Sequence, residues 1–497
     1  MKNITNTWED STMNFARSIL VLAAVAITLM SSGCGQGPQM ASSPEQNPQM
    51  TSSPEIVKSS SIFTKNWSLL WHLNTNGVQV DNQEIASNDS GNIAVAWRQV
   101  DGGANIIMAA LYDASENYWS PPVNIGDVNI TGVAFKPDVE MDASGNVVAV
   151  WTQFQGNRFK IMSSSYDNET GAWSGAIEID YTNGSHAFLP KVVMDSSGNA
   201  MAVWYQHDGS RYSIFSNRYN AQASEWGGAE LVEDIDTGDA FHPQVDGNGS
   251  GVVIVTWKQF DGQKDSAWVN RYDPVAGAWG DAETIENYNI DHVNDPVIAI
   301  NNAGDAIVSW YMKSGEFYNV YANIYDSAAG NWGEAVLIDA HDNGDAYSPV
   351  VDIDENGNAI VVWYHDDGTV YQLFTRRYDY QKGAWAATVQ LDSGENGDAE
   401  NPQVVLDPDG NAVVVWQRYS VNCRVKGARY DVTTDTWGDI ENICDQIIES
   451  LPEHIEDDST TINVYDPRIV FDQSGRAVVL WRVSCEDGGC LMVSILN

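Results

Sequence analysis

The amino-acid sequence predicts an all-β fold, an eight-bladed β-propeller of four-stranded antiparallel blades. Three observations support this prediction. A ten-residue stretch, DASGNVVAVW, occurs in eight related copies with a period close to 53 residues, and the copies end at Trp97, Trp151, Trp204, Trp257, Trp310, Trp363, Trp416 and Trp481. A second tryptophan series runs out of phase with the first, at Trp67, Trp119, Trp173, Trp226, Trp279, Trp332, Trp385 and Trp437. The third observation is that no amphipathic helix of useful length interrupts the repeats.

Each repeat contains four short strands. In the second copy PDVEM alternates from Pro137, DASGN is a turn, and VVAVWTQF is an apolar run. RFKIMSSSYD follows the turn QGN, and WSGAIEI follows the turn NETGA. One such sheet cannot cover both of its faces, whereas a ring of sheets buries each one against its neighbours. We therefore expect a closed ring of blades.

The recurring stretch predicts a sharp turn followed by a buried indole. Asp142 can hydrogen-bond the turn backbone and Gly145 can adopt a positive φ angle, so the chain reverses between the first and second strands. Trp151 then lies along the second strand, where its ring can pack between adjacent sheets. Full burial of a tryptophan contributes roughly 4–6 kcal/mol before entropy is counted. We interpret the stretch as architecture rather than chemistry.

The two ends of the repeat region are complementary. The last copy, which ends at Trp481, is followed by too few residues for a fourth strand. At the other end, WSLLWHLNTNG from Trp67 aligns with the fourth-strand sequence WSGAIEIDYTNG from Trp173. We expect the N-terminal strand to complete the last blade and so to close the ring.

Residues 1–33 are interpreted as a lipoprotein-type signal peptide. Arg17 precedes an apolar run of 13 residues, which is shorter than a membrane span. The small residues and Cys34 that follow resemble the lipobox of bacterial lipoproteins. The resemblance implies cleavage before Cys34 and acylation of its thiol, as with palmitate. A plain secretory signal is the alternative.

Residues 34–61 are rich in Pro, Ser and Gln, and in them PQM-x-SSPE occurs twice. Such a segment has nothing to bury and predicts a flexible tether. We expect the propeller to occupy residues 62–497 and to be held off a membrane by the tether. The expected location is the bacterial cell envelope, on the periplasmic or cell-surface side, with the lipid anchor as the sole membrane contact and a monomeric body.

The formal net charge is -43, with a pI near 4.2. Such a surface repels phosphate backbones and anionic headgroups, so nucleic acid is not an expected partner. Cations, basic proteins and neutral sugars stay compatible with it. The alternative interpretation of the charge is solubility of a large surface outside the cytoplasm.

Four further cysteines lie late in the chain. Cys423 and Cys444 are placed symmetrically about one predicted hairpin turn, so they should face each other on paired strands. Cys485 and Cys490 flank the turn EDGG in the same way. We expect two disulfides, formed in an oxidising compartment. The spacing does not support a CxxC-type metal or redox site.

One face of a propeller collects the connections between second and third strands and those from one blade to the next. Here these connections are acidic and aromatic, as in GDAFHP and GDAYSP. The aromatic residues two positions before proline would form a partial ring at this face: Phe135, Phe188, Phe241, Tyr347 and Tyr465. With carboxylates around them they could stack sugar rings or hold a cation. The alternative is that they simply pack between blades.

Asp239, Asp345 and Asp398 occupy equivalent places in three of these connections. They could bind calcium, the one cofactor that we consider, through loop carboxylates and carbonyls. Solvated turn acids are the alternative.

The interval before Trp481 is longer than the others and places 12 extra residues between Trp437 and Pro467. Long loops in compact repeats are often functional. Candidates for a specific contact are His454, Glu456, Asp457 and Asp458. A decorative insertion is the alternative.

The stretch YD-x-x-TG-x-W, which ends at Trp173, resembles the tryptophan-docking motif of PQQ-type eight-bladed propellers. That family includes quinoprotein dehydrogenases and an outer-membrane assembly lipoprotein, and the resemblance implies architecture only. The sialidase Asp-box is a poorer match, because its aromatic residue lies closer to the Asp than Trp151 lies to Asp142.

No nucleophile elbow, HExxH motif or phosphate loop occurs in the chain. We therefore expect a non-catalytic binding or scaffold propeller that recognises protein or glycan on its loop face. The alternative is a carbohydrate-active enzyme, a glycosidase or lyase, with carboxylates in the central channel. A quinoprotein is a third hypothesis.

Overall fold

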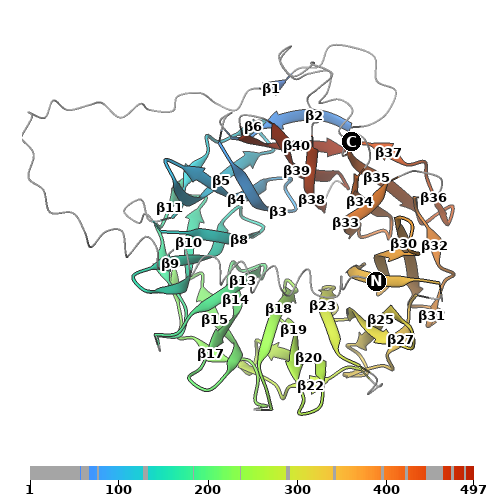
Figure 1. Ribbon diagram of the computed structural model, residues 1–497. Helices are drawn as coiled ribbons and strands as arrows, with labels where there is room; N and C mark the ends of the chain where they lie inside the picture. Colours follow the sequence, from blue (N-terminus) through green and yellow to red (C-terminus); the bar gives the residue numbers. More distant parts are fainter. Residues whose placement is uncertain are drawn as a thin grey trace, which may run out of the picture. The chain divides into compact units, whose positions relative to one another are not determined.

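A computed structural model confirms the predicted fold, a closed ring of eight antiparallel sheets (Figure 1). It describes residues 56–57, 67–74, 78–126, 132–182, 184–235, 237–286, 291–339, 343–392, 397–419, 424–443, 463–471, 475–485 and 488–496. These residues belong to one unit, Thr51–Asn497. None of them is helical, so no described segment is a helix that could cross a membrane.

The first strand of each blade lies nearest the centre of the ring in Figure 1. In blades 1 to 8 these inner strands are β3 (Val80–Ser87), β8 (Ala134–Met141), β13 (Ala187–Met194), β18 (Ala240–Gly247), β23 (Val293–Ile300), β28 (Asp345–Ile353), β33 (Asp398–Leu406) and β38 (Asn463–Phe471). Successive inner strands contact each other, and β38 also contacts β3. The row of inner strands therefore closes around the ring axis.

The second and third strands form a long hairpin in every blade. The second strands are β4 (Ile93–Asp101), β9 (Val147–Gln155), β14 (Ala200–His207), β19 (Val253–Phe260), β24 (Ala306–Ser314), β29 (Ala359–Asp366), β34 (Ala412–Tyr419) and β39 (Ala477–Cys485). The third strands are β5 (Ala104–Asp113), β10 (Arg158–Asp167), β15 (Tyr212–Asn220), β20 (Asp265–Asp273), β25 (Phe317–Asp326), β30 (Tyr371–Asp379), β35 (Arg424–Asp431) and β40 (Gly488–Leu496).

The fourth strand of blades 1 to 7 is split into two short segments, both paired with the third strand. The segments are β6 (Tyr118–Trp119) and β7 (Val123–Asn124), β11 (Ala172–Trp173) and β12 (Ile177–Glu178), β16 (Glu225–Trp226) and β17 (Glu230–Leu231), β21 (Ala278–Trp279) and β22 (Glu283–Thr284), β26 (Asn331–Trp332) and β27 (Val336–Leu337), β31 (Ala384–Trp385) and β32 (Val389–Gln390), and β36 (Thr436–Trp437) and β37 (Glu441–Asn442). In blade 2 the break coincides with Gly175, whose φ of 83° is incompatible with a continuous strand.

Blade 8 is completed by the N-terminal strand β2 (Trp67–His72), as expected. Strand β2 pairs with β40 in a register that sets Trp67 opposite Leu496, and β1 (Ile56–Val57) pairs with β2. The indole of Trp71 is buried and lies 5.4 Å from the Tyr112 ring of blade 1. The closing strand therefore packs against the first blade while it hydrogen-bonds the last.

The recurring ten residues build the turn between first and second strands. Asp142 Oδ1 accepts hydrogen bonds from the backbone N–H groups of Ser144 and Asn146, and Gly145 has a φ of 84°. Asn146 Oδ1 accepts from the N–H of Asn168, which ties this turn to the turn between third and fourth strands. The same bonds recur in blades 3 and 6, so the Asp and the Asn of the stretch have structural partners there too.

The tryptophans that end the ten-residue stretch form the inter-blade core. All eight are 0% exposed. Trp151, for example, packs among Ile107 and Ala109 of blade 1 and Val147 of its own blade. In blades 1 to 7 the tryptophan of the second series lies on the fourth strand and pairs across strands with a tyrosine, as Trp173 does with Tyr166 at 5.5 Å, whereas Trp67 pairs with Leu496. The first series holds blades together and the second holds the outer strand to its sheet.

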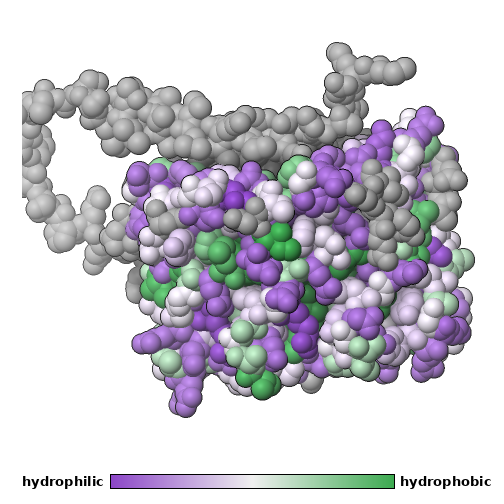
Figure 2. Space-filling model, turned by 90° about the horizontal axis from the view of Figure 1, so that it is seen from below, coloured by the Kyte–Doolittle hydropathy of each residue, from purple (hydrophilic) through white to green (hydrophobic). Residues whose placement is uncertain are grey.

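The outer wall of the ring is predominantly polar on the side of blades 3 to 5 (Figure 2). Figure 2 shows the side on which blades 3 to 5 lie, where hydrophobic residues form small groups separated by polar ones. Leu231, Val275 and Leu337 are exposed there, one on each of these blades. This side therefore lacks the continuous apolar area that a permanent partner chain would cover.

Gly198 tests the packing of neighbouring turns. A Cβ at Gly198 would lie 2.8 Å from Asp142 Oδ2 of the preceding blade, and its φ is 82°. We predict that Gly198→Ala lowers the free energy of unfolding by about 1–3 kcal/mol. Gly156→Ala is the control, because Gly156 also has a positive φ but its Cβ would meet nothing within 4 Å. Equal losses in urea unfolding of the two variants would contradict a close inter-blade contact.

Candidate functional site

Each inner strand contains a β-bulge near its start, at one end of the ring axis. The bulged residues have φ angles of 42–54°, a conformation that non-glycine residues rarely adopt, and they are Asn82, Lys136, Leu189, His242, Asp295, Ser348, Asn401 and Asp466. In seven blades a proline follows, and proline ordinarily disfavours this region for its predecessor. Because the bulge recurs in every blade, it is a feature of the architecture.

Bulged residues of successive blades contact each other. The backbone N–H of Lys136 donates to Asn82 Oδ1, and His242 Nδ1 lies 3.7 Å from Asp295 Oδ1. Asn401 Nδ2 donates to Asp466 Oδ1 at 3.5 Å. These side chains form a polar rim where the inner strands begin. Both kinds of connection predicted to share one face meet at this rim, and we call this end of the ring the loop face.

The five predicted aromatic residues directly precede the bulges, but their environments differ. Phe135 and Phe188 are buried, and both contact the fully buried ring of Phe159. Phe241 and Tyr347 are partly exposed. Tyr465 lies under the guanidinium of Arg482, 4.6 Å from its centroid. The rings of blades 2 and 3 therefore pack as core, whereas those of later blades reach the surface.

Three blades carry an identical arrangement of two tyrosines and an aspartate, which we call the Tyr–Tyr–Asp unit. One tyrosine follows the core tryptophan on the second strand, and the other lies at or near the start of the third strand. The aspartate lies at the junction with the next blade, at or just before the start of its inner strand. The units are Tyr205, Tyr212 and Asp239 in blade 3, Tyr311, Tyr318 and Asp345 in blade 5, and Tyr364, Tyr371 and Asp398 in blade 6.

Within each unit the two rings are in contact, and the aspartate accepts a hydrogen bond from the backbone of the second tyrosine. The ring centroids lie 5.6, 5.8 and 5.3 Å apart in blades 3, 5 and 6. The backbone N–H of Tyr212 donates to Asp239 Oδ1, that of Tyr318 to Asp345 Oδ1, and that of Tyr371 to Asp398 Oδ1. All six tyrosines are partly buried. Each unit thus keeps only part of its aromatic surface accessible to solvent.

The predicted calcium ligands Asp239, Asp345 and Asp398 are therefore the aspartates of the three units. Each uses one carboxylate oxygen for the backbone bond, and they lie in three different connections rather than together. His186 and His292 take the same role in blades 2 and 4 through Nδ1. Within the described ranges no group of three or more His, Cys, Asp or Glu side chains could hold a metal ion. Calcium binding stays a prediction.

The next inner strand adds a third ring to two of the units. In blade 5 the Tyr347 ring lies 5.6 Å from Tyr311 and 5.5 Å from Tyr318. Phe241 occupies the equivalent place beside the blade 3 unit. Glu400 replaces the aromatic residue beside the blade 6 unit. The residue types beside the units thus change from apolar to acidic around the ring.

The hydroxyls of Tyr311 and Tyr364 stay protonated at physiological pH. Burial, followed by the charge of Asp295, raises the pKa of Tyr311, and burial raises the pKa of Tyr364 to about 12. Tyr311 OH donates to Asp295 Oδ2 at 3.3 Å. Burial acts to raise the pKa of Asp295, but His242, Lys258 and Tyr311 together outweigh it and lower that pKa. The site combines hydroxyl donors with an ionised carboxylate.

The inner strands carry a second set of charges. Arg468 pairs with Glu84 at 2.8 Å and Lys191 with Asp138 at 2.8 Å, both across blade boundaries. Asp246 Oδ2 accepts from the backbone N–H of Ile300 and Asp352 Oδ2 from that of Leu406, each in the next blade. Burial raises the pKa of Asp246 to about 6 and of Asp352 to about 7. Asp246 and Asp352 are the inner-strand carboxylates that the enzyme alternative could use. Each of them accepts a hydrogen bond from a backbone N–H group.

A further ring of acids follows the fourth strands and was not foreseen from the sequence. It comprises Asp180, Glu233, Asp339 and Asp392, which are buried, and Glu286, which is partly buried. Asp392 Oδ1 accepts from the backbone N–H of Leu373, and Asp180 Oδ2 from that of Ile161. Arg158 pairs with Asp180 at 2.8 Å. Because these acids are largely covered by protein and bond backbone or arginine, we interpret them as groups that stabilise the fold.

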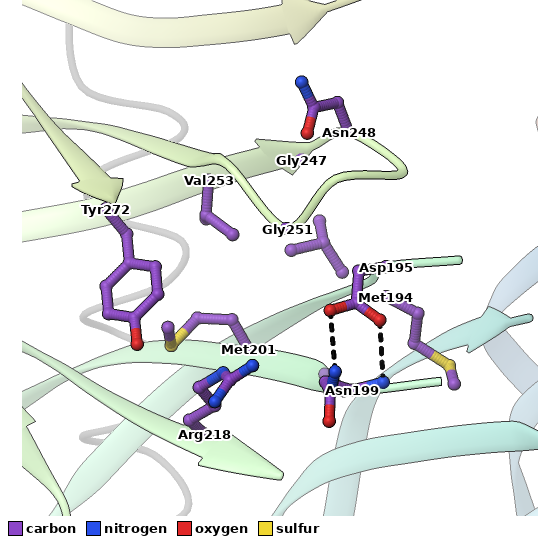
Figure 3. Close-up of a pocket in the computed structure, with 12 residues that line it drawn as sticks. Met194, Asp195, Asn199, Met201, Arg218, Gly247, Asn248, Gly251, Val253 and Tyr272 are labelled. Atoms are coloured by element: carbon purple, nitrogen blue, oxygen red, sulfur yellow. Dashed lines mark hydrogen bonds between the residues drawn. The ribbon is translucent and has the colours of Figure 1, made fainter. Parts of the chain in front are cut away.

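A small cavity lies between blades 3 and 4, beside the turns at the other end of the blades (Figure 3). Asp195 is held there by two hydrogen bonds from Asn199, and Met201, Arg218 and Tyr272 also line the space. Its volume of about 10 Å³ holds roughly one water molecule. The cavity is therefore too small for a ligand.

Several predicted residues lie outside the described ranges. They are Cys34, Cys423, Cys444, His454, Glu456, Asp457 and Asp458. In the β39–β40 hairpin the backbone register pairs Cys485 with Gly488 and Cys490 with Val483. The two expected disulfides and the role of the insertion stay predictions.

No family model and no curated protein matches the chain. Among solved structures, the Dos1 propeller is 11% identical with a TM-score of 0.46, and the match covers 86% of this chain and 95% of that one. A protein of unknown function from Dyadobacter fermentans is 13% identical with a TM-score of 0.42, over 61% of this chain and 95% of that one. An ulvan lyase of polysaccharide lyase family PL25 is 11% identical with a TM-score of 0.45, over 72% and 91%. None of these likenesses assigns a function.

The raised pKa of Asp352 predicts a pH dependence of stability. The native state keeps this proton up to about pH 7, whereas an unfolded Asp loses it near pH 4. Between these values the native state binds more protons, so rising pH lowers the contribution of Asp352 to stability. We predict that the difference in unfolding free energy shifts in favour of Asp352→Asn as pH rises from about 5 to about 8. A difference independent of pH would contradict a raised pKa.

Proposed function

We propose that this protein binds glycan on its loop face, through the Tyr–Tyr–Asp units. The observation that carries the proposal is the threefold occurrence of the unit, in which partly exposed tyrosines lie side by side and the aspartate bonds the backbone of the second one. Core packing alone does not require tyrosine there, since Phe159 fills the place equivalent to Tyr212 in blade 2 while fully buried.

The chemistry of the unit suits a carbohydrate. An aromatic face packs against the C–H face of a pyranose ring, and tyrosine adds a hydroxyl at its edge. The carboxylate oxygens that do not bond backbone can accept hydrogen bonds from sugar hydroxyls. Because the rings are fixed before the ligand arrives, little side-chain entropy is lost on binding.

We further propose that the propeller acts outside the cytoplasm, anchored through acylated Cys34. The sequence features that support this are the apolar run after Arg17 and the Pro- and Ser-rich tether. The two expected disulfides fit the same oxidising compartment. The strongly acidic surface also fits a partner that is not itself polyanionic.

A carbohydrate-active enzyme is the second candidate. The observation that favours it is the pair Asp246 and Asp352, whose raised pKa values lie near the range of a general acid. The backbone bonds that both carboxylates accept favour a structural role. Turnover of a glycan that disappears in Asp352→Asn would favour the enzyme.

A glycan array followed by calorimetry tests the binding function. We predict that Tyr318→Ala combined with Tyr371→Ala weakens binding of the best array ligand roughly tenfold or more, because two stacking faces are lost. Tyr118→Ala is the matched control, since Tyr118 is an exposed tyrosine on the fourth strand of blade 1. Unchanged affinity in the double variant, or equal loss in the control, would contradict the proposal.

A further inference from the structure

The blade 5 and 6 units lie among carboxylates. Burial is the largest cause of the raised pKa values of Tyr311, Tyr347 and Tyr371. The carboxylates that raise them further are Asp295, Asp345, Asp366, Asp398 and Glu400. Lys258 lies near Asp295 and offsets part of this charge, and Lys313 pairs with Tyr318 in the strand register. Carboxylates outnumber these lysines, so the tyrosine rings of both blades sit in a negative field.

In blade 8 the aromatic residue at the start of the inner strand contacts a cationic side chain of the same blade. Tyr465 is the equivalent of Tyr347, and the guanidinium of Arg482 lies 4.6 Å from its centroid. Arg482 Nη2 also lies 3.5 Å from Asp466 Oδ2. One cation is thus shared by an aromatic face and a carboxylate.

In the described part of blades 5 and 6 the Tyr347 ring lies beside acids and another tyrosine rather than under a guanidinium. In blade 6 the residue equivalent to Arg482 is Tyr364, whose centroid lies 5.8 Å from that of Tyr347. Asp345 hydrogen-bonds Tyr347 and Asp295 hydrogen-bonds Tyr311. A cation from a ligand would therefore meet the same two kinds of group that hold Arg482 in blade 8.

The repetition of the unit bears on the kind of ligand. Blades 5 and 6 are neighbours and present the same three residues in the same places, one blade apart. A polymer with its own chemical repeat can contact two identical units in the same way. A folded basic protein or an irregular peptide has no such repeat to match.

We propose that the blade 5 and 6 units bind a polysaccharide that carries protonated amines, an amino-sugar polymer. This inference rests on the proposed glycan-binding function and names its ligand class. The pyranose faces stack on the tyrosines while the ammonium groups approach Asp345 and Asp398, the carboxylates of the two units.

The test compares two probes of equal length, the hexamer of glucosamine and the hexamer of N-acetylglucosamine, by calorimetry on the purified propeller. They share their sugar rings and differ in charge. We expect the glucosamine hexamer to bind at least about tenfold more tightly at about 0.05 M salt, and to lose most of this advantage at about 0.5 M.

The matched variants change charge without removing a fold contact. Asp345→Asn combined with Asp398→Asn keeps an oxygen that can accept from Tyr318 and Tyr371, and should weaken glucosamine hexamer binding roughly tenfold. Asp89→Asn combined with Asp409→Asn removes the same charge from exposed turns at the opposite end of the blades and should not. The control for folding is thermal unfolding: both double variants should unfold at the same temperature as the wild-type protein.

Equal binding of the two hexamers, with no effect of the Asp345 and Asp398 changes, would overturn the amine inference and leave glycan binding standing. Binding of neither hexamer nor any array glycan would overturn both. Tight binding of a lysine-rich peptide, without binding of the glucosamine hexamer, would overturn the inference in favour of a peptide ligand.

Discussion

The structure depends on one constraint, that eight sheets must bury both faces against each other and leave no blade at an end. Eight core tryptophans, each 0% exposed, fill the space between the sheets. A row of blades with free ends would leave two apolar faces open, at a cost of the order of 25 cal/mol for each Å². Pairing of β2 with β40 removes those ends, because residues near the start of the chain complete the last sheet. Ring closure therefore stabilises every blade.

Closure leaves the two ends of each blade free to differ. At one end the DASGN-type turns contact each other around the ring, and residues there are repeated with little variation. At the loop face the backbone repeats, as the eight bulges show, but the side chains change from blade to blade. Buried phenylalanines in blades 2 and 3, Tyr–Tyr–Asp units in blades 3, 5 and 6, and the Arg482 and Tyr465 pair in blade 8 share one scaffold. At the loop face the backbone is thus the same in every blade, and only the side chains differ.

The fold could be predicted from the sequence because the repeat is regular. The tryptophan spacing gives the number of blades, and the alignment of the sequence from Trp67 with that from Trp173 shows which strand closes the ring. The candidate site was predicted only in part. Asp239, Asp345 and Asp398 were predicted as calcium ligands, with solvated turn acids as the alternative, and sequence spacing does not reveal that each also accepts a backbone bond. Tyr311 and Tyr364 were missed although both directly follow a core tryptophan, since tyrosine is an ordinary strand residue. The residues before proline adopt a positive φ that proline ordinarily disfavours for its predecessor. Local sequence therefore does not predict this conformation, which depends on the packing of the ring.

Hydrogen exchange measured by mass spectrometry tests ring closure most directly, with the full chain compared to one that begins after His72 and so lacks β2. If closure stabilises all blades, exchange should accelerate in β40, which loses its partner strand, and also in the second strands of blades 3 to 5 on the far side of the ring. Faster exchange confined to β40 and its immediate neighbours, with the distant second strands as protected as before, would contradict the account.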